Sequence, residues 1–473
     1  MSDKSKTIQI ETHKCNTDMW EKQESKARGE KSFLQSVCKL AIPVALQCML
    51  QSSFSMIDQV MIGQLGSISI TAVGIAGKFS SIYSVIAAAI STVAGIMIAQ
   101  YIGAGEEEES FKSFWVNTLA AMAVAAVFTM LSICLAGPIL EIYTTDQAAI
   151  AEGAVYLRII SFTFIPMAIS SIAATWLRCH EKASLPLYAS FLAVLCNTGL
   201  NYVLIFGKLG LPRLQSMGAG YATLISQLVN MLLMVIGMLW CVKKEQKRTC
   251  FSIRLEKMTK NQYLVMLLPI LLTEFLWSLG ENVYAVIYGH LGTSSFAAMT
   301  LTGPVQGLFI GALSGLSGAA AVLIGKELGK KNFEKAYKDG KKLVLYGIIG
   351  ALGLSVLLIL LSGFYVSIYY VEEEVKQTAR LLLIAFAVYA PVKVTNMILG
   401  GGIIRSGGNT KLIMYIDIIG TWGFGVPLGL LAAYVLKWSI PYVYLLLSFE
   451  EVIRLLMEWY VFRHRKWMHY IGE

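Results

Sequence analysis

A single aspartate lies on one polar face of the first long apolar segment of the chain. Gln47, Gln51, Ser55 and Asp58 are spaced four, four and three residues apart, so they share one face of a helix. In a helix that crosses lipid, such a face must turn toward protein, because burying ionisable groups in lipid is costly. Asp58 is the only charged residue of that face, and it is either a hydrogen-bonded structural acid or a functional group.

Two further apolar segments, the fifth and the sixth, place oxygen-bearing groups at a similar depth. These groups belong to Asn197, Asn201, Ala219 and Thr223, the alanine through its backbone carbonyl. An acid, two amides, a hydroxyl and a carbonyl at one level can form an oxygen-rich cation site. Oxygen ligands suit a hard ion such as sodium, and the same groups can hydrogen-bond a carboxyl that takes a proton. We therefore expect a coupling-ion site here, with a proton or a sodium ion at Asp58.

The second half of the chain carries its own intramembrane charges. Glu274 and Glu281 lie in the seventh apolar segment, where Glu274 is either functional or paired with a loop lysine. Lys393 in the tenth segment is either the partner of a seventh-segment glutamate or a side chain that reaches the interface. Asp417 in the eleventh segment is either a functional group or a structural partner of Arg405. The candidates for lining a central cavity are Gln47, Gln51, Ser55, Glu274, Glu281 and Lys393.

The segments that hold these residues form an internal repeat. The stretch 43–77 returns 226 positions later at 269–303, with a proline at the entry and matching glycines in the turn. One residue more carries Arg178 onto Arg405. Each copy is a long apolar run, a glycine turn and a second apolar run, which is typical of a pair of membrane helices.

Composition places these helices in a membrane. The 473 residues are 56% hydrophobic and only 15% charged, and a bilayer-spanning helix needs about 20 consecutive apolar residues. Hydropathy predicts an all-α integral membrane fold of twelve spans, built as two six-helix repeats (an N-lobe and a C-lobe) around a central cavity. The predicted divisions are an N-terminal tail 1–40, the N-lobe 41–242, a linker 243–263, the C-lobe 264–462 and a C-terminal tail 463–473.

The distribution of Lys and Arg predicts the orientation. With the N-terminus inside, the cytoplasmic stretches hold 30 of these residues and the outside loops hold five. Because positive loops stay in the cytoplasm, both tails and the linker are expected there, in a multi-pass protein of the cell membrane. The net charge of +9 thus indicates loop placement and no nucleic-acid partner.

Four motifs resemble the multidrug and toxic compound extrusion (MATE) family of bacterial transporters. They are P…ID…GQLG at 43–66, NTGLNYVLIFG at 197–207, MGAGYAT at 217–223 and RSGGNTKLIMYID…W…P at 405–427. The resemblance implies export of cationic or amphipathic compounds by antiport against protons or sodium, through alternating access of the two lobes. It also implies that Asp58, Asn197, Ala219 and Thr223 are the N-lobe site. Asn201 departs from the family pattern, in which many members have aspartate, and this leaves the coupling ion open.

Other functions are less compatible with the sequence. A flippase for a lipid-linked precursor, from the same superfamily, is the alternative, but it predicts extra helices and a more basic cavity. An enzyme is disfavoured because HExxH, GxSxG and P-loop motifs do not occur. We expect no cofactor beyond the coupling ion, and a monomer whose partners are the bilayer, the ion and a small-molecule substrate.

Overall fold

The computed structural model describes residues 32–53, 57–58, 61–245, 260–369 and 371–472, all of whose regular elements are helical. Residues 1–31 of the predicted tail 1–40, and residues 246–259 of the predicted linker 243–263, lie outside these residues. The N-lobe begins with the first helix, described over Ser32–Ser53 and in short pieces up to residue 63. The helices that follow it are α2 (Ser67–Ala104), α3 (Glu107–Cys134), α4 (Ala136–Glu141), α5 (Gln147–Ser161), α6 (Phe164–Cys179), α7 (Ser184–Phe206) and α8 (Gln215–Lys244).

The second half follows the same order but is more broken near its end. Its α-helices are α9 (Lys260–His290), α10 (Thr293–Gly329), α11 (Phe333–Ser367), α12 (Glu373–Asn396), α13 (Thr410–Ile418), α14 (Val426–Leu430), α15 (Ile440–Leu447) and α16 (Phe449–Arg463). Between them lie the π-helical segments η1 (Met397–Ile404), η3 (Ile419–Gly425) and η4 (Leu431–Val435), and the short 3-10 turn η2 (Arg405–Gly407). Such π-helical insertions are often found at functional sites.

Ten helices of the described residues are long and apolar enough to cross a membrane. The predicted fourth span is a bent pair, α5 and α6, which meet at 43° and bring the number to eleven. The sequence predicted this span at 153–176, with Pro166 marking a bend. Pro166 in the first turn of α6 explains the break, because it lacks an N–H and is favoured at the start of a helix. The short helices α15 and α16 occupy the predicted twelfth span, so the twelve-span, all-α fold is confirmed.

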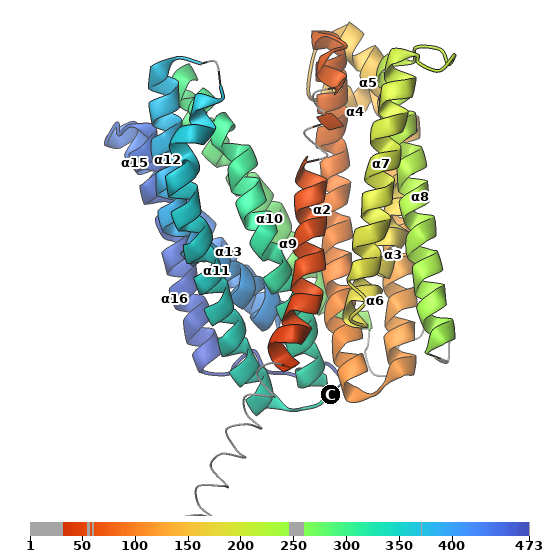
Figure 1. Ribbon diagram of the computed structural model, residues 1–473, viewed down its shortest axis with the longest axis vertical. Helices are drawn as coiled ribbons and strands as arrows, with labels where there is room; N and C mark the ends of the chain where they lie inside the picture. Colours follow the sequence, from red (N-terminus) through yellow and green to blue (C-terminus); the bar gives the residue numbers. More distant parts are fainter. Residues whose placement is uncertain (1–31, 54–56, 59–60, 246–259, 370, 473) are drawn as a thin grey trace, which may run out of the picture.

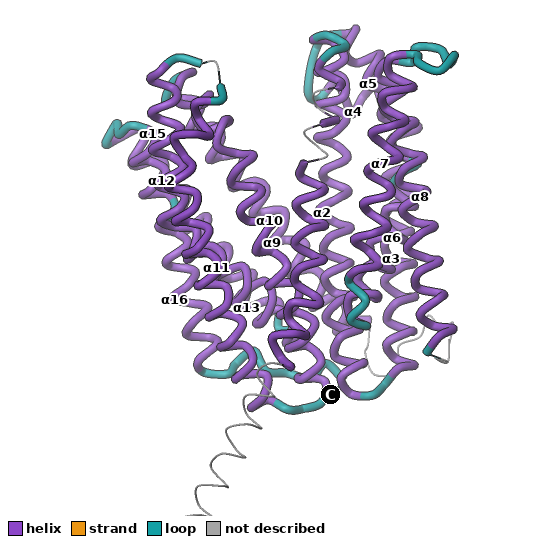
Figure 2. Tube along the Cα trace, viewed as in Figure 1, coloured by secondary structure: helices purple, strands orange, loops and turns teal. Residues whose placement is uncertain are grey.

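The two halves form separate lobes that meet at one end. Figure 1 shows the helices up to α8 on one side and those from α9 on the other, with the ribbons diverging away from the C-terminus. The tube in Figure 2 shows the same divergence, with connections gathered where the lobes meet. We refer to this end, which holds the C-terminus, as the closed end.

Glycines set the turns and the lobe contact. Gly66 and Gly292, one in each repeat, have φ of 102° and 116°, a left-handed backbone that favours glycine. At the closed end, a Cβ on Gly103 of α2 would strike the carbonyl oxygen of Lys326 on α10. A Cβ on Gly329 of α10 would likewise strike the carbonyl oxygen of Gln100 on α2. Since both glycines and both contacted residues are repeat partners 226 positions apart, the lobes pack through equivalent surfaces.

Candidate functional site

Asp58 is held by an amide of the neighbouring helix α7. Asn201 Nδ2 donates to Asp58 Oδ1 and, at 2.8 Å, to Asn197 Oδ1. Asn197 Nδ2 donates in turn to Thr223 Oγ1 at 3.3 Å on α8, and the Thr223 hydroxyl donates to the Ala219 carbonyl at 2.9 Å. Both amides are buried, with 1–2% of their surface exposed, because α7 and α8 pack closely here. The structure thus places all five predicted N-lobe residues in one hydrogen-bonded chain.

One atom of this chain lacks a partner. The carbonyl oxygen of Asn201 is buried and accepts no hydrogen bond from the described residues. A buried acceptor without a donor is costly, so a ligand that supplies positive charge or a proton is favoured beside it. Together with the Asp58 carboxylate, this oxygen suits a sodium ion or a protonated carboxyl equally.

Two members of the site carried no distinctive sequence signal. Ser226, one turn beyond Thr223 on α8, accepts a hydrogen bond from Asn197 Nδ2 at 3.1 Å. Tyr156 is buried on α5 and lies within electrostatic range of Asp58.

The remaining polar residues of the first helix do not all reach this chain. Gln47 is buried and donates to Ser190 Oγ on α7 at 2.8 Å, so the polar face turns toward protein at this residue. Gln51 is exposed, and Ser55 lies outside the described residues. The first helix therefore contributes two contacts to α7, one through Gln47 and one through Asp58.

The C-lobe holds a second polar cluster, and its ion pairs differ from those expected. Glu274 pairs with Arg405 at 3.2 Å and not with a loop lysine. The alternative that Asp417 pairs with Arg405 is wrong, since its ion pair is with Arg454 at 3.7 Å. Lys393 pairs with Glu451 at 3.7 Å, so its ion-pair partner is on α16 and not on the seventh segment. Glu281 is exposed and shares a small cavity of about 70 Å³ with Lys393.

The helix α16 supplies the residues that sequence reasoning missed. Glu450, Arg454 and Glu458 are spaced four apart on one face, and this stripe is a signal that could have been found. The Tyr284 hydroxyl donates to Glu450 Oε2 at 2.6 Å, whereas Glu458 Oε2 is buried and has no partner in the described chain. Glu451, next to the stripe, accepts from Asn396 Nδ2 at 2.8 Å.

Glycines in the π-helical segments make room for this stripe. The side chains of Glu458, Arg454 and Glu450 lie where a Cβ would otherwise project from Gly400, Gly420 and Gly425 respectively. Beside them is a cavity of about 280 Å³, lined by Glu274, Lys393, Asp417 and Arg454 among others. The cluster has more acids than bases, so it favours positively charged ligands.

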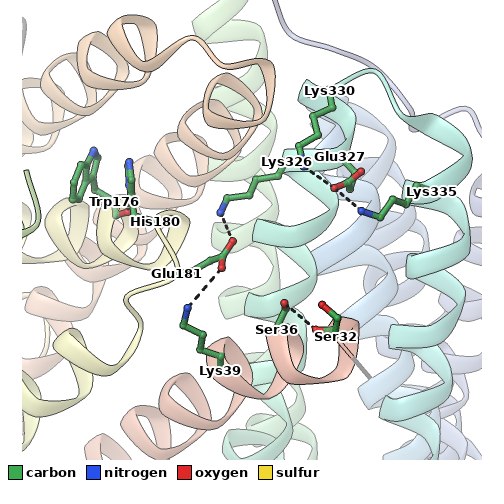
Figure 3. Close-up of polar contacts among 10 residues, drawn as sticks. All are labelled: Ser32, Ser36, Lys39, Trp176, His180, Glu181, Lys326, Glu327, Lys330 and Lys335. Atoms are coloured by element: carbon green, nitrogen blue, oxygen red, sulfur yellow. Dashed lines mark hydrogen bonds and ion pairs between the residues drawn. The ribbon is translucent and has the colours of Figure 1, made fainter. Parts of the chain in front are cut away.

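The closed end is fastened by polar contacts between the lobes. Lys326 of α10 donates across the lobes to Glu181 Oε1 in the α6–α7 connection at 2.7 Å, and within the N-lobe Lys39 lies 3.9 Å from Glu181 Oε2 (Figure 3). Burial opposes the charged form of Glu181, but the hydrogen bond and charge of Lys326, with the charge of Lys39, outweigh it. They hold the pKa of the Glu181 carboxyl below its ordinary value.

The C-terminal segment adds to this closure. Gln100 of α2 donates to the backbone carbonyl of Ser406 at 2.7 Å and to that of His469 at 3.2 Å. The backbone N–H of Ile471 donates to Gln100 Oε1 at 2.8 Å. The last residues of the C-lobe chain therefore bind directly to the N-lobe.

Comparison with known proteins agrees with this architecture. The chain is 21% identical over 445 residues to the "Uncharacterized transporter YisQ" of Bacillus subtilis, covering 94% of this chain and 96% of that one. It is 26% identical to the "Probable multidrug resistance protein NorM" of Streptococcus pneumoniae over 83% of this chain and 86% of that one. A crystal structure described as MATE in the bent conformation superposes with a TM-score of 0.82 at 17% identity, covering 92% and 95% of the two chains.

The sequence model of the MatE family matches residues 43–203 and 269–431. These two matches span more than half of the chain, and each lies in one of the two structural repeats. They include the helices that carry Asp58, Asn197 and Lys393. This family consists of transporters, not of enzymes. The chain therefore belongs to the MATE family and is a multi-pass membrane transporter.

Proposed function

We propose that this protein is a secondary antiporter that exports cationic or amphipathic compounds in exchange for protons or sodium. The observation that carries the proposal is the contact of Asp58 with Asn201, inside a buried chain of amides and hydroxyls. A lone intramembrane carboxylate of this kind can hold one cation at a time. The names of relatives that refer to multidrug resistance support the substrate class.

In this proposal Asp58 couples the ion to the compound. When Asp58 is ionised, the Asn201 amide stabilises its charge; when a proton or sodium ion binds, the Asn201 carbonyl oxygen is available as an acceptor. The ion and the compound then favour different arrangements of the lobes. This difference in affinity for the two arrangements couples the movement of the ion to that of the compound. The C-lobe cluster around Arg454, with its excess of acids, adds negative charge to the cavity that a cationic compound would enter.

The closed end is proposed to face the cytoplasm of the cell. The basic residues Lys39 and Lys326 gather there, and positive residues are retained on the cytoplasmic side. The arrangement would then be outward-facing, with the protein acting as a monomer in the cell membrane. Single cysteines at 207–216 should react with an impermeant thiol reagent in intact cells, and cysteines at 243–261 should not. Labelling of the second stretch in sealed cells would contradict this orientation.

Transport in proteoliposomes tests the exchange itself. A proton gradient and a sodium gradient are imposed separately, and uptake of a fluorescent organic cation is followed in the direction opposite to the ion. We expect one of the two gradients to drive transport. Transport that needs ATP and proceeds without either gradient would refute the proposal. The flippase alternative is not favoured, because the named relatives are multidrug resistance proteins.

A further inference from the structure

Arg178 carries a positive charge for which the described chain supplies no acidic partner. It lies in the last turn of α6, and its Nη2 donates to the hydroxyl of Thr175 at 2.8 Å. The ionisable groups that face it are the thiols of Cys48 and Cys179, and no carboxylate of the described residues lies within ion-pair distance. Charges removed from water are normally paired, so an unpaired guanidinium between helices indicates a missing anion.

The repeat partner of Arg178 faces the same space. Arg405 follows η1 in the C-lobe, and its Nη1 is 3.2 Å from Glu274 Oε1. Its Nε is buried and has no hydrogen-bond partner in the described part of the chain. Glu274 therefore pairs with Arg405 alone, and Arg405 keeps one buried donor without a partner in the described residues.

A cavity of about 260 Å³ separates the lobes at this point, and both arginines line it. The hydroxyl-bearing residues on its wall are Ser91, Thr92, Thr175, Ser317 and Ser406. This volume is close to the lower limit of ligand pockets, about 300 Å³. It suits a small acidic group better than a whole drug-sized molecule.

The acids of the neighbouring C-lobe cluster do not neutralise this cavity. Asp417 and Glu458 act on Arg405 over a longer range, but their direct neighbour is Arg454. Neither contributes to the surroundings of Arg178. The two polar clusters thus differ in sign, with acids in excess around α16 and bases in excess between the lobes.

We infer that the cavity between Arg178 and Arg405 binds an oxyanion, with the chemistry of a carboxylate or a phosphate group. Arginine donors match the geometry of such groups through paired hydrogen bonds. The ligand is either the acidic group of a transported compound, which rests on the proposed export function, or a free anion. Because the arginines belong to different lobes, the bound anion links the lobes near the closed end.

Equilibrium binding to the purified full-length protein tests this inference without any ion gradient. Thermal unfolding is measured with sodium phosphate or sodium acetate and, at matched ionic strength and pH, with sodium chloride. We expect phosphate or acetate to raise the unfolding midpoint to a plateau, since a ligand that binds the folded state stabilises it. The absence of a plateau, or an equal rise with chloride, would overturn the oxyanion assignment.

Variants locate the effect. Arg178→Gln should weaken anion binding by about 10- to 100-fold, the range for hydrogen bonds to charged groups. It should leave stability without anion unchanged or higher, because it removes an unpaired charge. Arg178→Lys should also weaken binding, since a lysine is a point charge without the paired donors. Arg158→Gln, on an exposed position of α5, is the matched control and should bind like the parent. Equal binding by the parent and both Arg178 variants would refute the site.

A pair of probes separates the two sources of the anion. An amphipathic carboxylic acid and its methyl ester are compared for binding to the parent protein and to Arg178→Gln. Tighter binding of the acid, lost in the variant, assigns the site to a transported compound. If acid and ester bind alike while phosphate still stabilises through Arg178, the ligand is a free anion. Because neither readout involves transport, failure of the antiport proposal would leave both results interpretable.

Discussion

Removing the charge of Glu181 should release the closed end without unfolding the protein. Glu181→Gln keeps the shape of the side chain but abolishes the ion pairs with Lys326 at 2.7 Å and Lys39 at 3.9 Å. The Glu181 side chain is 35% exposed and that of Lys326 is 14% exposed, so solvent weakens their attraction. We therefore assign the contact about 1 kcal/mol, the upper part of the range for exposed pairs. That corresponds to about a fivefold shift in the ratio of closed to open arrangements.

Distances between spin labels placed on the two lobes at the closed end measure this ratio. Glu334→Gln is the matched control, because its ion pair with Arg465 joins two parts of the C-lobe. We expect a larger population of long distances in Glu181→Gln and none in the control. A double-mutant cycle with Lys326→Gln should show that the two changes are not additive. An unchanged distance distribution in Glu181→Gln, or the same shift in Glu334→Gln, would refute the role of this contact.

Three further outcomes follow from the packing and the charges. Gly329→Ala should weaken the closed end by about 1–3 kcal/mol, because the added Cβ meets the backbone of α2. Gly353→Ala is the control and should have no such effect, because Gly353 faces open space. The label distances and the unfolding midpoint are measured for both variants. Arg454→Gln should destabilise the protein by about 3–5 kcal/mol by leaving buried acids unpaired, while Glu458→Gln should be neutral or stabilising in the same unfolding assay. Because the folded protein lowers the pKa of Glu181, the stabilisation is fully present above the ordinary glutamate pKa of about 4.3 and is lost as the pH falls from there through the lower folded pKa. Label distances across a pH series check this.

The sequence was sufficient for the N-lobe site because its members lie close together along helices. Asn197 and Asn201 are one turn apart on α7, and the segment that holds Thr223 follows directly as α8. Helical spacing and approximate depth therefore predicted that Asn197, Asn201 and Thr223 lie at the same level in the membrane as Asp58. The order of apolar segments likewise predicted the lobes, since each span is recognisable from its own composition.

The C-lobe pairs could not be predicted in the same way. Which partner Lys393 selects depends on how α12 packs against α16, and hydropathy does not contain that information. Asp417 pairs with Arg454 of α16, which lies more than thirty residues further along the chain, so the local sequence around Asp417 did not reveal its partner.

The most direct test of the central claim is ion-driven export by Asp58→Asn in proteoliposomes. The substitution changes shape little and removes one charge, so the purified variant should fold and still bind a fluorescent organic cation. Glu281→Gln, an exposed C-lobe acid, is assayed beside it at the same protein density. The account predicts that gradient-driven transport is lost in Asp58→Asn and retained in Glu281→Gln. Normal transport by Asp58→Asn, with loss in Glu281→Gln, would show that coupling lies in the C-lobe and would contradict the account.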